Sequence, residues 1–331
     1  MKKPAISRVT RLDIEQTRLV TKVARLHHTQ GQRQSEIAEK LGISQASVSR
    51  FLQLAEEQGI IRTIVVPPEG LYPGLEDGLM EIYGLDAAYV VDISVDEPDV
   101  AHVLGAAAAD CLSNEFKGGP VFGLTSWSAT LREMAKQLLP RHSEAIKIVE
   151  MLGDLGSPML QHEAALATLQ MAKALDAEAV FLRTPGVMPS GELRKAALSD
   201  AHIQTALRLL DKVDVAFVGI GPADFHGPLE EGDNFFSAEQ LAKVRAAGAV
   251  GQLHQRFIDA HGQSVETELD QLVVGITLEQ LRNAGRRIAV AGGADKHVAL
   301  AAALAGRWID VLVTDVNSAN YLMNIAGKGK S

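Results

Sequence analysis

Short apolar segments in the C-terminal part of the chain are each followed by residues able to bind a small polar ligand. Those residues are Ser126, Trp127, Ser128, Ala129 and Thr130 after Val121–Leu124, Gly219 and Gly221 after 213–218, Lys296 after 288–291, and Asp315 after 311–313. Hydroxyls and free backbone amides at the start of a helix bind anions or hydroxyl groups. The Lys296 ammonium can pair with a phosphate or carboxylate. Singly, a serine or aspartate here is often only a helix cap. Together these groups predict one crevice for a sugar or sugar phosphate.

Three further residues complete the predicted effector site. Gly153 begins the loop 153–158, and His162 follows that loop beside Glu163. We expect His162 to hydrogen-bond ligand or solvent. Asp224 follows the Gly219–Gly221 turn and, with Asp315, is a candidate carboxylate base near Lys296.

Motifs for covalent, metal or nucleotide chemistry are missing from the sequence. It has no GxSxG turn and no P-loop, and Gly219 and Gly221 lack the third glycine of the dinucleotide fingerprint. The ten histidines are scattered, with no HExxH and no Cys/His cluster. We therefore expect no metal and no cofactor. An isomerase or deaminase acting on a sugar phosphate, with Asp315 or Asp224 as the base, remains the alternative to a binding protein.

The elements that must position these residues alternate between β-branched runs and helical segments. We expect strands over 87–91, 121–124, 146–152, 179–182, 213–220, 288–291 and 311–314, with helices over 100–116, 129–139 and 163–175 among them. Such alternation predicts an α/β domain with a mainly parallel, doubly wound sheet covered on both faces. In open sheets of this kind, ligands bind beyond the carboxyl ends of the strands. Residues 248–262 indicate an irregular or antiparallel excursion.

The N-terminal segment 34–66 has the pattern of a helix-turn-helix. Apolar Ile37, Ala38 and Leu41 lie on one face of a first helix, Gly42 permits the turn, and Ser44 can cap a second helix. A preceding helix over 14–30 and a short strand, or wing, over 60–66 complete a small all-α (winged) domain. An ordinary helical hairpin with a solvated polar face is the plainer interpretation, but the glycine, the cap and the basic surroundings favour DNA binding.

A helix-turn-helix places the start of its second helix in the major groove, where glutamine and arginine read base edges and serine holds phosphate. The predicted DNA-binding residues are Arg33, Gln34, Ser44, Gln45, Ala46, Ser47, Ser49, Arg50 and Arg62. A third interpretation treats residues 1–66 as a protein-docking or dimerisation module only.

Charge and composition divide the chain in the same way. Residues 1–66 hold 11 Lys and Arg against 6 Asp and Glu, a net charge of +5. Because the whole chain has a net charge of −9, the remaining residues carry a net charge of −14. A basic N-terminal domain attached to an acidic C-terminal domain indicates that the N-terminal domain contacts the phosphates of DNA. We place the boundary at the stiff Pro-Pro segment 67–70, with residues 71–331 as the effector-binding domain. With one cysteine, Cys111, no signal-peptide pattern and no apolar run of membrane length, we expect a cytoplasmic protein.

The whole chain resembles the SorC/deoxyribonucleoside-regulator family of bacterial sugar-responsive transcription factors. The motifs are QSEIAEKLGISQASVSRFLQLAEEQGII, FGLTSWSATL, DVAFVGIG, GAVGQLHQRFIDAHG, AVAGGADKHVALAAAL and VLVTDVNSA, in order over nearly the full length. The resemblance implies an effector domain with the fold of sugar-phosphate isomerases and deaminases, no enzyme activity, and a homo-oligomer, either a dimer or a tetramer of paired dimers. It also implies that Ser126–Thr130, Gly219–Gly221, Lys296 and Asp315 line the effector site.

One loop departs from that pattern. Where members that sense sugar phosphates often have a Gly-Gly-Thr-Thr-like loop, this chain has Trp127-Ser128-Ala129-Thr130. Without glycines, backbone amides wrap a phosphate less closely, while the indole offers a flat face for a sugar ring. The leading hypothesis is therefore a regulator of a sugar or polyol catabolic operon. Its affinity for operator DNA would be controlled by a small sugar, polyol or sugar phosphate.

Overall fold

The computed structural model describes residues 14–61, 68, 70–93, 99–112, 115, 119–140, 143–224 and 234–328. The chain forms two compact units, Met1–Val66 and Pro67–Ser331, so the division falls at the first proline of the Pro-Pro pair. Among the described residues, no helix is long and apolar enough to cross a membrane.

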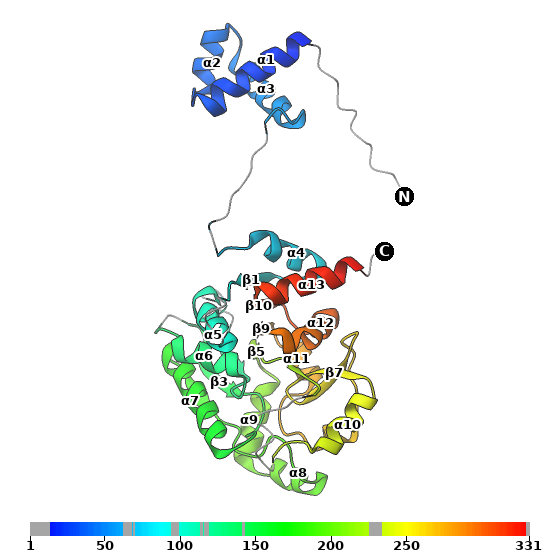
Figure 1. The fold of residues 1–331 in the computed structure, drawn as a ribbon. Helices are drawn as coiled ribbons and strands as arrows, with labels where there is room; N and C mark the ends of the chain where they lie inside the picture. Colours follow the sequence, from blue (N-terminus) through cyan, green and yellow to red (C-terminus); the bar gives the residue numbers. More distant parts are fainter. Residues whose placement is uncertain are drawn as a thin grey trace. The chain divides into compact units, whose positions relative to one another are not determined.

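Within its described residues, the smaller unit is a bundle of three α-helices (Figure 1). Helix α1 (Ile14–Ala24) continues into a π-helical turn (Arg25–Thr29), and Gly31 ends it with a φ of 67°. Helices α2 (Gln34–Leu41) and α3 (Gln45–Glu57) follow. Their shared core contains Val23, Leu26, Ile37, Val48 and Leu52. The predicted helix over 14–30 and the helix pair are therefore confirmed.

The turn between α2 and α3 has the local chemistry that the sequence predicts. Gly42 adopts a left-handed conformation with φ 66°, which a side chain would strain. The Ser44 hydroxyl accepts a hydrogen bond from the Ser47 amide at 3.1 Å and caps α3. Ile43 packs between the helices against the same core. Of the predicted wing, Ile60 and Ile61 form a bend, and residues 62–66 lie outside the described residues.

The larger unit is built on a sheet of seven parallel strands in the order β1-β10-β9-β5-β2-β3-β4. The strands are β1 (Ala87–Val91), β2 (Val121–Leu124), β3 (Lys147–Glu150), β4 (Glu178–Val180), β5 (Val215–Val218), β9 (Arg286–Val290) and β10 (Val311–Asp315). All seven predicted strands are present, and β1 and β2 have the predicted bounds. The parallel sheet is confirmed.

Helices cover both faces of this sheet (Figure 1). The strand β5 shows why: Val215 and Phe217 enter one core, whereas Ala216 and Val218 enter the other. Helices α5 (Val100–Cys111), α6 (Ala129–Gln137) and α7 (Pro158–Leu175) pack on the first face. Helices α4 (Pro73–Tyr83), α9 (Ala201–Leu210), α11 (Leu278–Asn283), α12 (His297–Ala305) and α13 (Val316–Lys328) pack on the second.

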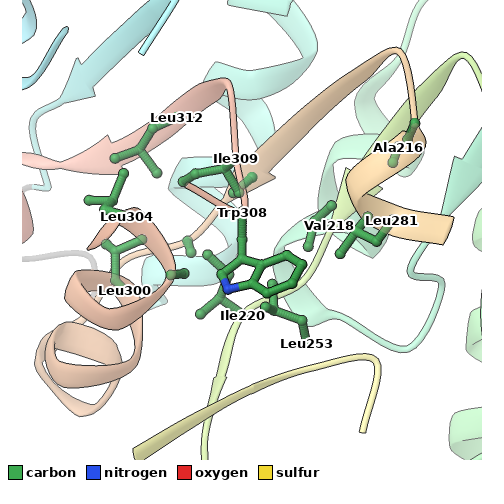
Figure 2. Packing of buried hydrophobic residues seen from close by; sticks show 14 of the residues in the cluster. Ala216, Val218, Ile220, Leu253, Leu281, Leu300, Leu304, Trp308, Ile309 and Leu312 are labelled. Carbon is green, nitrogen blue, oxygen red and sulfur yellow. The ribbon is translucent and has the colours of Figure 1, made fainter. Parts of the chain in front are cut away.

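A small antiparallel sheet, β6 (Gly221–Pro222), β7 (Ala249–Leu253) and β8 (Arg256–Asp259), confirms the predicted antiparallel excursion. Helix α10 (Ala238–Ala246) packs beside it, and α8 (Gly191–Leu198) precedes α9. Figure 2 shows Leu253 of β7 and Ile220 packed against Trp308, whose indole N–H donates to the Gly262 carbonyl at 2.7 Å. The hairpin is thereby fixed to the main sheet.

Candidate functional site

The loops after β2 and β5 meet at the point where the chain reverses its direction across the sheet. After β2 the chain continues to β3 on one side, and after β5 it continues to β9 on the other. Backbone contacts join the two loops: the Thr125 amide donates to the Phe217 carbonyl at 3.0 Å, and the Gly219 amide donates to Oγ1 of Thr125 at 3.2 Å. Such a switch point is where open α/β sheets bind ligands.

A cavity of about 150 Å³ opens at this point. Its lining consists of Trp127, Ser128, Ala129, Arg132, Leu160, Gly219, Ile220, Gly221, Gln252 and Lys296. Predicted effector residues from three separate loops therefore meet in one cavity: Trp127, Ser128 and Ala129 after β2, Gly219 and Gly221 after β5, and Lys296 after β9. No carboxylate and no imidazole is among the lining side chains.

The remaining predicted residues do not line this cavity. Ser126 and Thr130 are buried beneath the loop, and Thr130 donates to the Val290 carbonyl at 2.6 Å, which ties α6 to β9. Gly153 lies so close to the Thr184 and Gly186 backbones that any side chain would collide. His162 is exposed on α7, and the exposed Asp224 pairs with Arg245.

Asp315 is part of the scaffold that holds the cavity loop carrying Lys296. It is buried, and its carboxylate accepts from the Gly293 amide at 2.8 Å, the Ser318 amide at 2.9 Å and the Ser318 hydroxyl at 2.6 Å. Burial alone would raise the pKa of Asp315, but these hydrogen bonds outweigh it and lower the pKa. A side chain at Gly292 would collide with the Asp315 carboxylate. The Asn317 backbone also hydrogen-bonds to this carboxylate, so the partners of Asp315 belong to the scaffold rather than to a ligand.

Two cationic side chains, Lys296 and Arg132, line the cavity. Burial lowers the pKa of Lys296, and Asp295 partly opposes the shift. Arg132 donates to the Trp127 carbonyl at 2.6 Å and lies 3.5 Å from the Glu163 carboxylate. Burial also lowers the pKa of Arg132, and Glu163 opposes it. A desolvated cation attracts an anionic ligand more strongly than an exposed one does.

Arg132 and Gln252 were not among the predicted effector residues. Arg132 lies three residues after Ala129, and this helical spacing brings it to the same face of α6. That spacing was the available signal. Gln252 lies in the hairpin, far from any parallel strand end in sequence, and no local signal connects it to the cavity.

The helix-turn-helix presents a separate polar surface. Gln45, Ala46, Ser49 and Arg50 are exposed at the start of α3, and Arg33 is exposed just before α2. Ser47, whose hydroxyl lies 2.9 Å from the Ser44 hydroxyl, and Gln34 at the start of α2 are half-buried. Arg62 lies outside the described residues. Within the described ranges, no cluster of three or more His, Cys, Asp or Glu could hold a metal ion.

Comparisons with known proteins cover both units. A family model described as "Putative sugar-binding domain" matches residues 73–324, and one described as "Winged helix-turn-helix DNA-binding" matches residues 26–62. The deoxyribonucleoside regulator of Bacillus subtilis (strain 168) is 28% identical over 314 residues, which cover 95% of this chain and 99% of that protein. The sorbitol operon regulator of Klebsiella pneumoniae is also 28% identical, over 92% of this chain and 98% of that protein.

Solved structures also show similarity to a regulator over both units. The crystal structure of the full-length sorbitol operon regulator SorC from Klebsiella pneumoniae superposes with a TM-score of 0.70 at 26% identity. The superposition covers 93% of this chain and 99% of that one. The similarity therefore extends over both the DNA-binding and the sugar-binding parts.

Proposed function

This chain belongs to the SorC family of sugar-binding transcriptional regulators, and we propose that its switch-point cavity is the effector site and α3 its recognition helix. It is a carbohydrate-responsive DNA-binding regulator and not an enzyme, as its relatives are regulators. The enzyme alternative also needs a carboxylate base beside Lys296, but Asp224 and Asp315 are engaged elsewhere.

One observation carries the assignment of the effector site. Residues from three loops that are distant in sequence, after β2, β5 and β9, converge on a single cavity that contains a half-buried lysine. A cavity with apolar walls and a few directed polar groups is the usual form of a small-ligand site. The relatives named for a sorbitol operon and for deoxyribonucleosides support a small sugar, polyol or sugar phosphate as the effector.

The DNA site is proposed on the exposed start of α3. Arg33 and Arg50 would neutralise phosphates, while Gln45 and Ser49 would meet base edges in the major groove. One recognition helix contacts only a short half-site, so we propose that a homo-oligomer, at least a dimer, binds a paired site. As a DNA-binding regulator it would act in the cytoplasm.

A mobility-shift titration with the DNA upstream of the chain's own gene tests the proposal. Binding should weaken with salt, with a log–log slope of about −0.9 for each phosphate neutralised. A sugar, polyol or sugar phosphate from a panel should change the affinity, because an effector acts by binding one arrangement of the protein better than another. Absence of DNA binding at low salt, with and without the panel, would contradict the proposal.

A further inference from the structure

The side chain of Gln252 has one fixed orientation at the cavity. It is 2% exposed and lines the cavity from strand β7. Its Oε1 accepts a hydrogen bond from the Gln255 backbone amide at 3.0 Å. A backbone N–H can only donate, so the atom that faces Gln255 must be the oxygen. The Nε2 group therefore occupies the other position, where it is buried and has no hydrogen-bond partner.

The surroundings of Gln252 hold it in this orientation. The Gln255 amide belongs to a tight turn in which His254 and Gln255 have φ values of 53° and 60°. On the other side, a Cβ placed on Gly221 would lie 2.6 Å from Nε2. Only a glycine leaves room for the amide there. A buried N–H without an acceptor destabilises the protein, so a bound ligand that accepts from it recovers stability.

Ser128 offers the cavity an acceptor, in contrast to the donor of Gln252, and this follows from a chain of hydrogen bonds. The Thr130 hydroxyl donates its one proton to the Val290 carbonyl at 2.6 Å. In the contact of 3.1 Å between the Ser128 and Thr130 hydroxyls, Ser128 must therefore be the donor. Because the Ser128 hydroxyl proton is donated to Thr130, the Ser128 oxygen can only accept a hydrogen bond from a ligand in the cavity.

The other polar side chains of the cavity donate. The indole Nε1 of Trp127 is buried without a partner, and Lys296 carries an ammonium. Arg132 also only donates, but its guanidinium already contacts the Trp127 carbonyl and Glu163. Trp127, Gln252 and Lys296 therefore require acceptor atoms, and Ser128 alone requires a hydroxyl proton. A neutral polyol brings a donor with every acceptor and would leave protons unmatched. A phosphate or carboxylate brings acceptors only.

We propose that Gln252 is the specificity-determining residue of this cavity: its fixed amide N–H donates to an anionic oxygen of the effector, so the protein responds to the anionic form of a sugar and not to the neutral form. This inference rests on the proposed effector site. The anionic group can be a phosphate or the carboxylate of a sugar acid, and both offer the same acceptor oxygens.

Calorimetric titration of the full chain tests this with matched probes: glucose, ribose and sorbitol, the monophosphates of each, and gluconate and ribonate, with inorganic phosphate alone. We expect at least one anionic probe to bind about tenfold or more tightly than its neutral parent, since a hydrogen bond to a charged group is stronger than one to a neutral group. Tighter binding of the monophosphates or of the sugar acids shows whether the anionic group of the effector is a phosphate or a carboxylate.

Two variants and a control isolate Gln252. Gln252→Glu keeps an oxygen for the Gln255 amide but turns a carboxylate oxygen toward the cavity, so anion affinity should fall about tenfold or more. Gln252→Met removes the donor without adding charge and should also weaken the anionic probe. The control Gln263→Glu makes the same change at an exposed site outside the cavity lining and should bind like wild type.

Three outcomes would overturn the inference. The first is that neutral parents bind the wild type as tightly as their anionic forms, a comparison that uses the wild-type protein alone. The second is that Gln252→Glu, with an unchanged melting temperature, binds the anionic probe as tightly as the Gln263→Glu control does. In both cases the effector site stands and only the role of Gln252 fails. If no probe binds, neutral or anionic, the proposed effector site itself is contradicted.

Discussion

Nε2 of His254 lies 2.7 Å from Oγ1 of Thr125, and this contact joins the tip of the β7–β8 hairpin to the loop that carries Trp127 and Ser128. The Thr125 hydroxyl also donates to the Phe217 carbonyl at 2.9 Å and accepts from the Gly219 amide. Its one proton is used, so His254 must donate from Nε2. One threonine therefore connects three segments around the cavity.

The tautomer agrees with the burial of the ring. His254 is fully buried, and burial, with the charge of Arg256, lowers its pKa to about 3. Nδ1 has no hydrogen-bond partner. His254 is thus neutral in the folded protein, where it acts as a fixed donor to Thr125.

Replacing Thr125 with valine should loosen this junction. The buried Gly219 amide and His254 Nε2–H would both lose their acceptor, at a cost of about 2–4 kcal/mol in unfolding free energy. The loops of the cavity would also lose their alignment, so effector affinity should fall. Thr205→Val, at an exposed position of α9, should stay within about 0.5 kcal/mol of wild type. Equal denaturation midpoints for the two variants would contradict this role of Thr125.

Glu150 should give the stability an unusual dependence on pH. Burial raises the pKa of this carboxyl to about 7, although the Leu182 amide and the Thr168 hydroxyl donate to it. The folded state therefore holds a proton that the unfolded chain releases above about pH 4.5. This contribution is complete below pH 4.5 and is lost as pH rises toward and through 7. His254 acts oppositely: its contribution is lost as pH falls from about 6.5 toward 3.

Glu150→Gln should therefore stabilise the protein by roughly 1–3 kcal/mol at pH 8 and have little effect at pH 4. The glutamine oxygen can face the Leu182 amide, and its NH₂ can donate to Thr168, whose hydroxyl then donates to Ala164. Urea denaturation at both pH values measures the difference. The exposed Glu192→Gln variant of α8 is the control. A Glu150→Gln protein that is less stable than wild type at pH 8 would refute the interpretation.

Arg50 and Gln45 should contribute differently to DNA binding. Arg50→Ala removes a phosphate contact, so affinity should fall similarly for all sequences and the log–log salt slope should shrink by about 0.9. Gln45→Ala should leave the slope unchanged and relax the preference for one base pair by about 1–3 kcal/mol. Arg208→Ala, on α9 of the other unit, should change neither quantity. Unaltered DNA binding by Arg50→Ala would instead favour a docking or dimerisation role for the N-terminal unit.

Gly221→Ala should reduce effector binding more than stability. The added methyl would lie 2.6 Å from Nε2 of Gln252, so it would displace the end of this side chain and break the contact with the Gln255 amide that fixes its orientation. The amide would then leave its bound orientation, while the fold would tolerate the shift. Gly191→Ala, with open space around it at the start of α8, should be neutral or stabilising by up to about 1 kcal/mol. Unchanged affinity for the effector in Gly221→Ala would show that the position of Gln252 does not matter.

The sequence alone determined the elements whose signals are local. Gly42 and Ser44 fix the helix-turn-helix because a left-handed turn and a helix cap depend on neighbouring residues only. The β-branched runs at Ala87–Val91 and Val121–Leu124 predict strands because each is buried over its whole length or on alternate residues. Once the strands are parallel, their carboxyl ends share one edge, so the loops with Trp127, Gly219 and Lys296 could be predicted to meet.

Only the tertiary structure decided which side chains enter the cavity and with what polarity. Asp315 ends a strand like the other site residues, but its carboxylate is held by Gly293 and Ser318. Gln252 reaches the cavity because the hairpin packs against Trp308 and the main sheet. Which atom of that amide is left without a protein partner depends on a single N–H of Gln255. The direction of a side chain is set by partners distant in sequence, and no local pattern encodes them.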